Sequence, residues 1–221
     1  MTIYVGPNPN TFPLPRIVRD GLVLWIDPSI SLSGTILNDI SKSGLGINGT
    51  LVGGSTFSPD NNGVIILDGQ PGSYIDVPIN LSTSSYTIMG ASRYVTVGGR
   101  TFSAKKNNWL MGQWSVTTEN YYANGWVSPV QNGPGDTNWR IYAATGNPFT
   151  DSWELYVNGI SEAGPNSGGS AGPNEFSIGS YLASSEWSNS QIGFLLCYNR
   201  VLTAAEISQN YEVLKSRFNL I

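Results

Sequence analysis

The chain has 221 residues, of which 15 are acidic and 11 basic, so only 12% of it is charged and its net charge is −4. Histidine is absent and cysteine occurs once, as Cys197. This composition excludes a Ser-His-Asp triad, an imidazole general base, a His-ligated or thiolate-cluster metal site and an internal disulfide. Nucleic-acid binders normally carry a basic footprint, so the acidic balance predicts no nucleic-acid partner.

The N-terminal residues 1–20 differ from the rest and are interpreted as a Pro-rich arm. Four prolines within the first fifteen residues fix φ and remove backbone donors, which favours an extended conformation. The arm either packs on its own domain or attaches to another subunit through its apolar side chains, which are Ile3, Tyr4, Val5 and Phe12. The start lacks the basic-then-apolar layout of a signal peptide. No stretch reaches the roughly 18 apolar residues of a membrane span.

From residue 21 to about residue 200 the pattern predicts β-structure. Short apolar or alternating runs are separated by clusters of Gly, Asn, Ser and Pro, which are typical of turns. The Asn158-Gly159 pair is a strong hairpin signal because both residues tolerate positive φ. The predicted strands cover residues 22–26, 64–67, 74–77, 86–89, 94–97, 109–111, 121–127, 139–143, 153–157, 176–178 and 192–198.

The C-terminal region predicts one amphipathic helix, at about residues 204–217. Thr203 and Glu206 have the spacing of a capping box, in which the hydroxyl and the carboxylate satisfy each other's backbone amides. Apolar side chains then recur at helical spacing, at Ile207, Tyr211, Leu214 and Phe218. The chain is therefore predicted to be one all-β domain, residues 21–221, with a closing helix.

Four segments resemble the laminin G-like, concanavalin A-like lectin jelly roll, of the type found in bacteriophage virion proteins. They are GLVLWIDPS (residues 21–29), GVIILDGQPGSYIDV (63–77), WELYVNGISEA (153–163) and IGFLLCYNRVLTAAEI (192–207). The resemblance implies two antiparallel sheets packed face to face, with loops at one rim that often bind sugars or calcium. It covers about residues 20–215 and indicates fold more strongly than function, since this fold hosts enzymes, lectins, adhesion modules and virion proteins.

Asp68 and Asp76 are the candidate calcium ligands near this rim. Many relatives have paired aspartates where this chain reads Gln-Pro-Gly-Ser at residues 70–73. A Ca²⁺ site needs about six to eight oxygen ligands, several of them carboxylates. We therefore favour a turn role for Asp68 and expect neither a metal nor a cofactor.

The acidic residues give no hydrolase signature. The glycoside hydrolases that this fold resembles carry a Glu-x-Asp-x-x-Glu run, which points two carboxylates into one cleft. Glu-x-Asp occurs nowhere in this chain, so we expect a protein that is not an enzyme.

Residues 107–142 are rich in aromatic and amide side chains. Aromatic rings stack on sugar faces and amides satisfy sugar hydroxyls, although Trp and Tyr are also preferred in strands and most of these rings are expected in the core. The candidate carbohydrate-binding residues are the turn-flanked Trp114, Tyr122, Trp126 and Trp139, together with Trp187 in the polar SSEWSNS segment.

Three functions remain consistent with these observations. The leading hypothesis is a non-enzymatic virion structural protein, a phage capsid-decoration, head-fibre or tail-fibre subunit. It would join other virion proteins through its arm, act within a homo-oligomer or larger assembly, and contact a host-surface glycan. The alternative is a carbohydrate-binding module of a cell-surface or extracellular protein, and the third is a glycan hydrolase.

Overall fold

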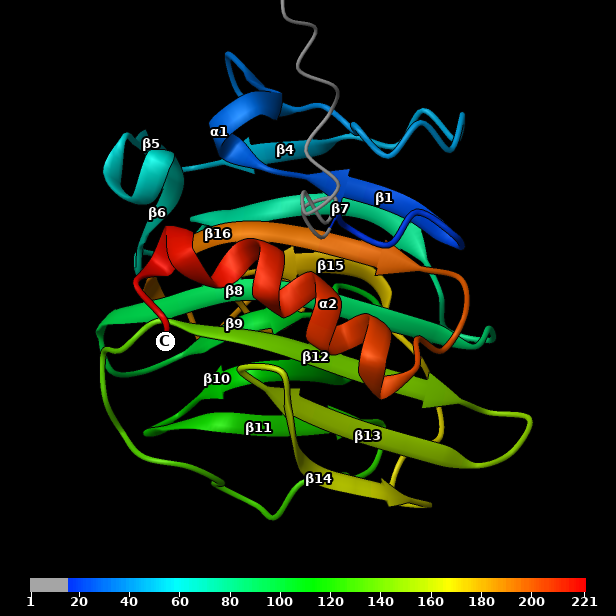
Figure 1. Cartoon of the computed structure of the whole chain (residues 1–221). Helices are drawn as coiled ribbons and strands as arrows, with labels where there is room; N and C mark the ends of the chain where they lie inside the picture. Colours follow the sequence, from blue (N-terminus) through cyan, green and yellow to red (C-terminus); the bar gives the residue numbers. More distant parts are fainter. Residues whose placement is uncertain (1–15) are drawn as a thin grey trace, which may run out of the picture.

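Three layers make up the protein in the computed structural model, which describes residues 16–221. A large antiparallel sheet lies in the middle, a second layer of strands packs on one face, and the C-terminal helix packs on the other (Figure 1). The predicted all-β jelly roll with one closing helix is confirmed.

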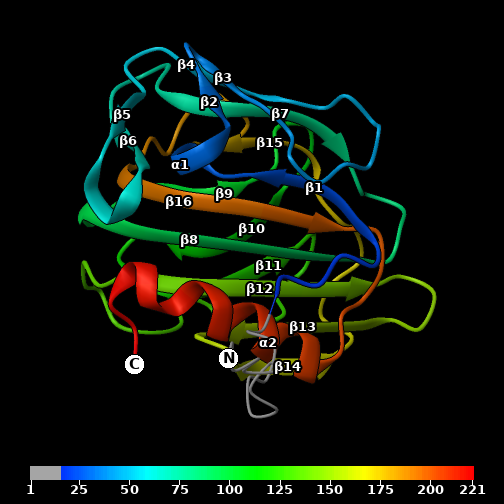
Figure 2. The same cartoon turned by 45° about the horizontal axis from the view of Figure 1, so that its top comes forward.

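The large sheet has the strand order β14-β13-β12-β8-β16-β6-β5, and β1 also pairs with β16. Figure 2 shows β1, β16, β8 and β12 side by side across this layer. The strands are β1 (Leu22–Ile26), β5 (Thr56–Ser58), β6 (Val64–Asp68), β8 (Tyr86–Thr96), β12 (Arg140–Asn147), β13 (Ser152–Val157), β14 (Ile160–Asn166) and β16 (Asn189–Tyr198).

The second layer consists of a five-stranded sheet, β15-β7-β4-β3-β2, and a three-stranded sheet, β11-β10-β9. A bridge between Ala104 and Phe176 joins them, together with backbone hydrogen bonds such as that from the Gly179 amide to the Thr101 carbonyl at 2.7 Å. The strands are β2 (Leu32–Ser33), β3 (Ile36–Leu37), β4 (Gly49–Val52), β7 (Tyr74–Asn80), β9 (Arg100–Ser103), β10 (Trp109–Trp114), β11 (Thr117–Ala123) and β15 (Asn174–Ile178).

Two apolar cores hold the layers together. Alternating side chains of both strand layers form the inner core, which includes the fully buried Trp109, Tyr121 and Trp153. The other face of the large sheet forms an outer core with the C-terminal helix, whose Ile207, Tyr211 and Leu214 are buried there. Strand residues of the large sheet therefore find apolar partners on both faces, as expected for the middle layer of three.

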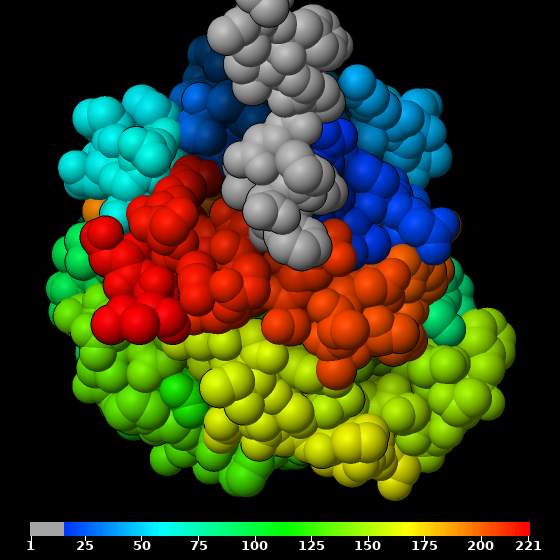
Figure 3. Space-filling view, in the orientation of Figure 1, coloured from blue at the N-terminus to red at the C-terminus, as the bar shows by residue number. Residues whose placement is uncertain are grey.

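The C-terminal helix, α2 (Ala204–Leu214), continues into the short 3₁₀ helix η2 (Lys215–Phe218). The predicted capping box is confirmed. The Thr203 hydroxyl accepts from the Glu206 amide at 3.3 Å, and the Glu206 carboxylate accepts from the Thr203 amide at 2.9 Å. This C-terminal segment packs on the large sheet, and Figure 3 shows it, in red, across the surface of that face. The other helical turns are α1 (Pro28–Ser31) and η1 (Asp60–Asn62).

The Asn158-Gly159 turn forms as predicted. Asn158 and Gly159 have φ values of 51° and 78°, and they join β13 to β14 with Val157 opposite Ile160. In contrast, the predicted strands at residues 86–89 and 94–97 are one strand, β8, because the residues between them also pair with β12 and β16. The sequence pattern missed the short β2 to β5, and also β9.

Packing on the domain begins before the predicted start at Gly21. Ile17 and Val18 are buried in the outer core, and the Val18 amide donates to the buried Asn210 side chain of α2 at 2.8 Å. The predicted attachment residues Ile3, Tyr4, Val5 and Phe12 lie outside the described residues. Among residues 16–221, no helix combines the length and hydrophobicity that crossing a bilayer requires.

Candidate functional site

A groove lies at the rim where β8 ends and β9 begins. Strand pairing brings Thr96, Asn189 and Asp68 together there, and it sets Trp114 opposite Arg100. Two hollows of about 390 and 280 Å³ share Val97, Gly98, Gly99 and Trp187 in their linings, so they adjoin each other, and together they are here called the rim groove. The first hollow is also lined by Trp114, Ser115, Val116 and Glu186, and the second by Asp68, Gly69, Gln70, Thr96 and Asn189.

Backbone contacts between two loops form the floor of the rim groove. Gly99 has a φ of 76°, and a Cβ atom built on it would lie 2.4 Å from the Trp187 carbonyl oxygen, so glycine is required there. The next amide, that of Arg100, donates to the Glu186 carbonyl at 3.0 Å. A Cβ atom on Gly98 would meet no atom within 4 Å. The rim groove therefore has a bare backbone floor that a ligand can approach closely.

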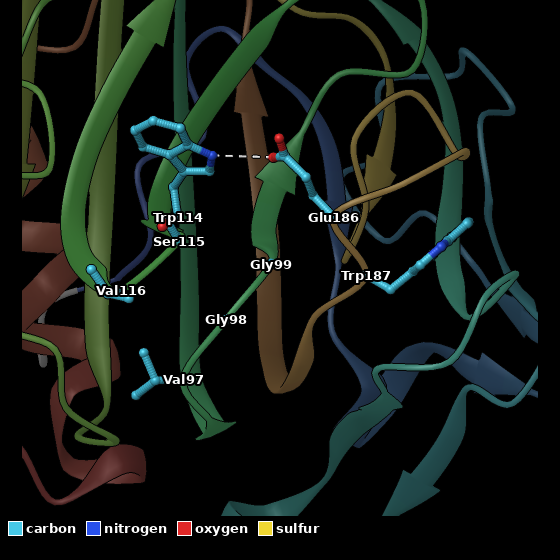
Figure 4. A pocket seen from close by; sticks show the side chains of 8 residues that line it. All are labelled: Val97, Gly98, Gly99, Trp114, Ser115, Val116, Glu186 and Trp187. Atoms are coloured by element: carbon cyan, nitrogen blue, oxygen red, sulfur yellow. Dashed lines mark hydrogen bonds between the residues drawn. The ribbon is translucent and has the colours of Figure 1, made fainter.

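Glu186 fixes the loop that carries Trp187. Its carboxylate is paired with the Arg100 guanidinium, and it accepts a hydrogen bond from Trp114 Nε1 at 3.1 Å (Figure 4). Glu186 itself has a left-handed φ of 49°, a conformation that costs a non-glycine residue energy and recurs at ligand sites. The pair with Arg100 and the bond from Trp114 hold it in place.

Partly exposed aromatic rings flank the rim groove on both sides. On the outer face of the three-stranded sheet, the Tyr122 and Trp126 ring centroids are 5.1 Å apart, and those of Trp126 and Trp114 are 5.3 Å apart. On the other side, the ring centroids of Trp187 and Tyr74 are 6.3 Å apart. Figure 4 shows the Trp187 side chain pointing away from Trp114. Four of the five predicted aromatic residues thus gather at this rim and the adjoining sheet face.

Trp139 does not join them, and the prediction that its ring is exposed is wrong. Its exposed fraction is 8%, and it packs on Phe218 with ring centroids 4.6 Å apart. Trp139 shares a face of β12 with Ile141 and Ala143, and all three belong to the outer core under α2 and η2. Its ring is therefore part of the packing between the large sheet and the C-terminal segment.

The two calcium candidates take different positions. Asp68 ends β6 and lines the second hollow, where its Oδ1 accepts from the Gln70 amide at 3.0 Å, as expected of a turn residue. Asp76 lies on β7 in the other layer, and Lys105 Nζ contacts both its carboxylate oxygens, at 2.9 and 2.8 Å. Among residues 16–221, no three His, Cys, Asp or Glu side chains are grouped to share a metal ion.

Sequence reasoning missed Glu186, Tyr74 and the loop at residues 97–99. Glu186 directly precedes the predicted Trp187, and the Gly98-Gly99 pair is a turn signal between two strands. Neither signal shows that the two loops meet, because their contact joins residues nearly ninety positions apart in the chain.

The fold is an all-β jelly roll with one C-terminal helix. No protein-family model matches the chain, and no curated protein matches it. Solved structures match the chain in fold, but their sequence identities of 12–16% show a shared fold and no more.

One is the binding domain of Paraclostridial Mosquitocidal Protein 1, with a TM-score of 0.63 and 15% identity over 88% of this chain and 52% of that one. A second is the botulinum neurotoxin serotype D ligand-binding domain in complex with N-acetylneuraminic acid, with a TM-score of 0.65 and 12% identity over 89% and 52% of the two chains. The chain thus spans about half the length of these two proteins.

A third is domain 4 of the arabinanase AbnA from Geobacillus stearothermophilus, in complex with arabinotriose, with a TM-score of 0.62 and 16% identity over 86% of this chain and 98% of that one. The lectin-like jelly-roll fold that the sequence resemblance implied is confirmed, whereas a link to phage proteins stays a prediction.

Proposed function

We propose that this protein is a non-catalytic carbohydrate-binding module and that the rim groove is its binding site. The observation that carries the proposal is the pair of adjoining hollows flanked by partly exposed rings, with Trp114 and Trp187 both in the lining of the first. The first hollow, at about 390 Å³, lies within the range of about 300–1,000 Å³ typical of small-ligand sites.

The chemistry of the lining suits sugars. Indole and phenol rings offer flat apolar faces for the C–H faces of a sugar ring. Ser115, Gln70 and Asn189 supply hydroxyl and amide groups for its hydroxyls. Two proteins of the same fold were solved with sugars bound, arabinotriose and N-acetylneuraminic acid, which supports a glycan as the ligand class.

A binding role fits the carboxylates better than hydrolysis does. Glycoside hydrolysis needs one carboxyl group that donates a proton and a second that attacks or activates water. In the rim groove, Asp68 of the second hollow accepts from the Gln70 amide, and Glu186 of the first hollow is engaged by Arg100 and Trp114. We infer that Glu186 positions Trp114 and the Trp187 loop.

A glycan array followed by titration calorimetry tests the proposal. Wild type should bind a subset of chains, and Trp187→Ala and Trp126→Ala should each weaken that binding by about tenfold or more, the scale of a buried aromatic anchor. Phe149→Ala is the matched control, because Phe149 is an 80% exposed ring in the β12–β13 turn at the opposite rim. Absence of binding above background, or binding that Trp187→Ala leaves unchanged, would contradict the proposal.

Display of this module on a virion is the second part of the proposal. It rests on the Pro-rich sequence of residues 1–15 and on the resemblance to virion proteins. Deleting residues 1–15 retains Arg16, whose carbonyl accepts from Gln209 of α2 at 2.6 Å, so the truncated chain should fold but fail to join its particle. Normal incorporation of the truncated chain would refute this part and leave the binding module intact.

A further inference from the structure

We propose that the rim groove selects neutral glycan chains and rejects sugars that carry a carboxylate, an inference that rests on the proposed function. The ionisable residues that line it are both acids, Glu186 in the first hollow and Asp68 in the second. None of the lysine and arginine side chains between residues 16 and 221 lines either hollow.

Arg100, the cation beside the first hollow, already binds other groups of the protein. The residue is only 5% exposed, and its guanidinium lies over the Tyr181 ring at 4.2 Å. Its Nε pairs with Glu186, and its Nη1 donates to Asn108 Oδ1 at 2.8 Å. A ligand carboxylate would have to break these contacts before it could gain a cationic partner.

The two lysines of the loop between β9 and β10 are paired as well. Lys105 Nζ contacts both carboxylate oxygens of Asp76, and Lys106 Nζ pairs with Glu175. The charged residues that line the rim groove are Glu186 and Asp68, and the whole chain has a net charge of −4, so we infer a negative field over the groove. An approaching anion is therefore opposed, and the opposition weakens as salt screens it.

A neutral glycan chain would not meet this electrostatic opposition. Its hydroxyl groups can donate to the carboxylates of Asp68 and Glu186, and hydrogen bonds to an ionised acceptor are about twice as strong as neutral ones. Because Trp187 lines both hollows, sugar units in either hollow can contact that residue. The favoured ligand is thus an uncharged oligosaccharide, unlike the acidic sugar bound by the serotype D neurotoxin domain of the same fold.

Matched pairs of glycans provide the test. Each pair holds a neutral chain and the same chain ending in N-acetylneuraminic or a uronic acid, first on an array and then by calorimetry at low and high salt. The neutral member should bind at least about tenfold more tightly, because like charges oppose each other in the groove. The difference should narrow at high salt.

Asp68→Asn tests whether charge is the cause. Asparagine keeps an acceptor for the Gln70 amide, so the turn is preserved, while the acidic member of each pair should gain affinity relative to the neutral one. Asp60→Asn is the control, since Asp60 is an exposed acid in η1 that lines neither hollow. It should leave the ratio of the neutral to the acidic affinity unchanged.

Three results would overturn the inference, and they separate it from the proposed function. If acidic members bind as tightly as neutral ones and Trp187→Ala abolishes both, the selectivity fails but the binding site stands. If Asp68→Asn changes the affinities for the neutral and the acidic member equally, the charge of Asp68 is not the cause of the selectivity. If no glycan binds, the proposed function itself fails.

Discussion

Two aromatic clusters lie on opposite outer faces of this protein, and only one of them is accessible. Trp139, Phe218 and Phe194 stack in series with centroid distances of 4.6 and 6.1 Å, and all three are buried. Tyr122, Trp126 and Trp114 form a similar series at 5.1 and 5.3 Å, yet each stays partly exposed.

The two clusters differ in exposure because different later segments of the chain pack over them. After β16, α2 and η2 return across the large sheet and bury the first cluster. Within residues 16–221, the contacts on the Trp114 ring come from loops, since Glu186 accepts from its Nε1 and Trp126 stacks on it. Whether a ring is available to a ligand therefore depends on which later element covers its sheet face, and not on the polarity of its neighbours in sequence.

The largest expected effect is a difference in stability between variants that remove a ring from each cluster. Trp139→Ala should lower the free energy of unfolding by about 3–5 kcal/mol, since it leaves a cavity under η2. Trp126→Ala should cost about 1 kcal/mol or less, as expected for a partly exposed ring. Urea denaturation of both variants measures this, and equal losses would remove the distinction between the clusters.

The next effect concerns the clamp that keeps Trp139 covered. Arg217 of η2 contacts both carboxylate oxygens of the buried Asp27, at 2.8 and 2.7 Å, and donates to the Gly193 carbonyl at 3.1 Å. Arg217→Met should cost about 3 kcal/mol because it leaves Asp27 buried and unpaired.

Lys215→Met is the control for this clamp. It removes the Lys215–Glu212 pair, in which both groups are more exposed, and the contact of Lys215 Nζ with the Tyr211 ring, 5.7 Å from its centroid, and it should cost under about 1 kcal/mol. Similar unfolding curves for the two variants would show that the clamp contributes little.

The smallest effect lies at the start of α2. Arg200 hydrogen-bonds Glu206 and, with the Thr203 amide, lowers the pKa of that carboxyl to about 2 from its ordinary 4.5. Because the folded pKa is depressed, the stabilisation is complete above pH 4.5 and is lost as the pH falls toward about 2.

After allowance for solvent screening, the contribution should be on the order of 1 kcal/mol. Glu206→Gln should therefore be less stable than wild type at pH 6 and equal to it near pH 2. A stability difference that does not change with pH would contradict this assignment.

The sequence predicted much of the fold because local signals and tertiary structure agree. The Asn158-Gly159 turn and the Thr203 to Glu206 capping box involve residues at most a few positions apart, and both form as expected. The short strands β2 to β5 were missed because two to four residues are too few to show a period.

The candidate site was predicted only in part, for a related reason. Aromatic composition correctly pointed to Trp114, Tyr122, Trp126 and Trp187 as rings at the surface, but it also pointed to Trp139. The contacts that decide these outcomes, Trp139 with Phe218 and Trp114 with Glu186, join residues more than seventy positions apart. No local pattern reports such a contact.

The indole N–H signals of the seven tryptophans test the central claim most directly. In an NMR titration with the neutral oligosaccharide that binds best on the array, the signals of Trp114 and Trp187 should shift in a saturable way. Those of Trp109, Trp139 and Trp153, which are buried, should not. Shifts confined to the buried tryptophans, or no saturable shift at Trp187, would contradict glycan binding in the rim groove.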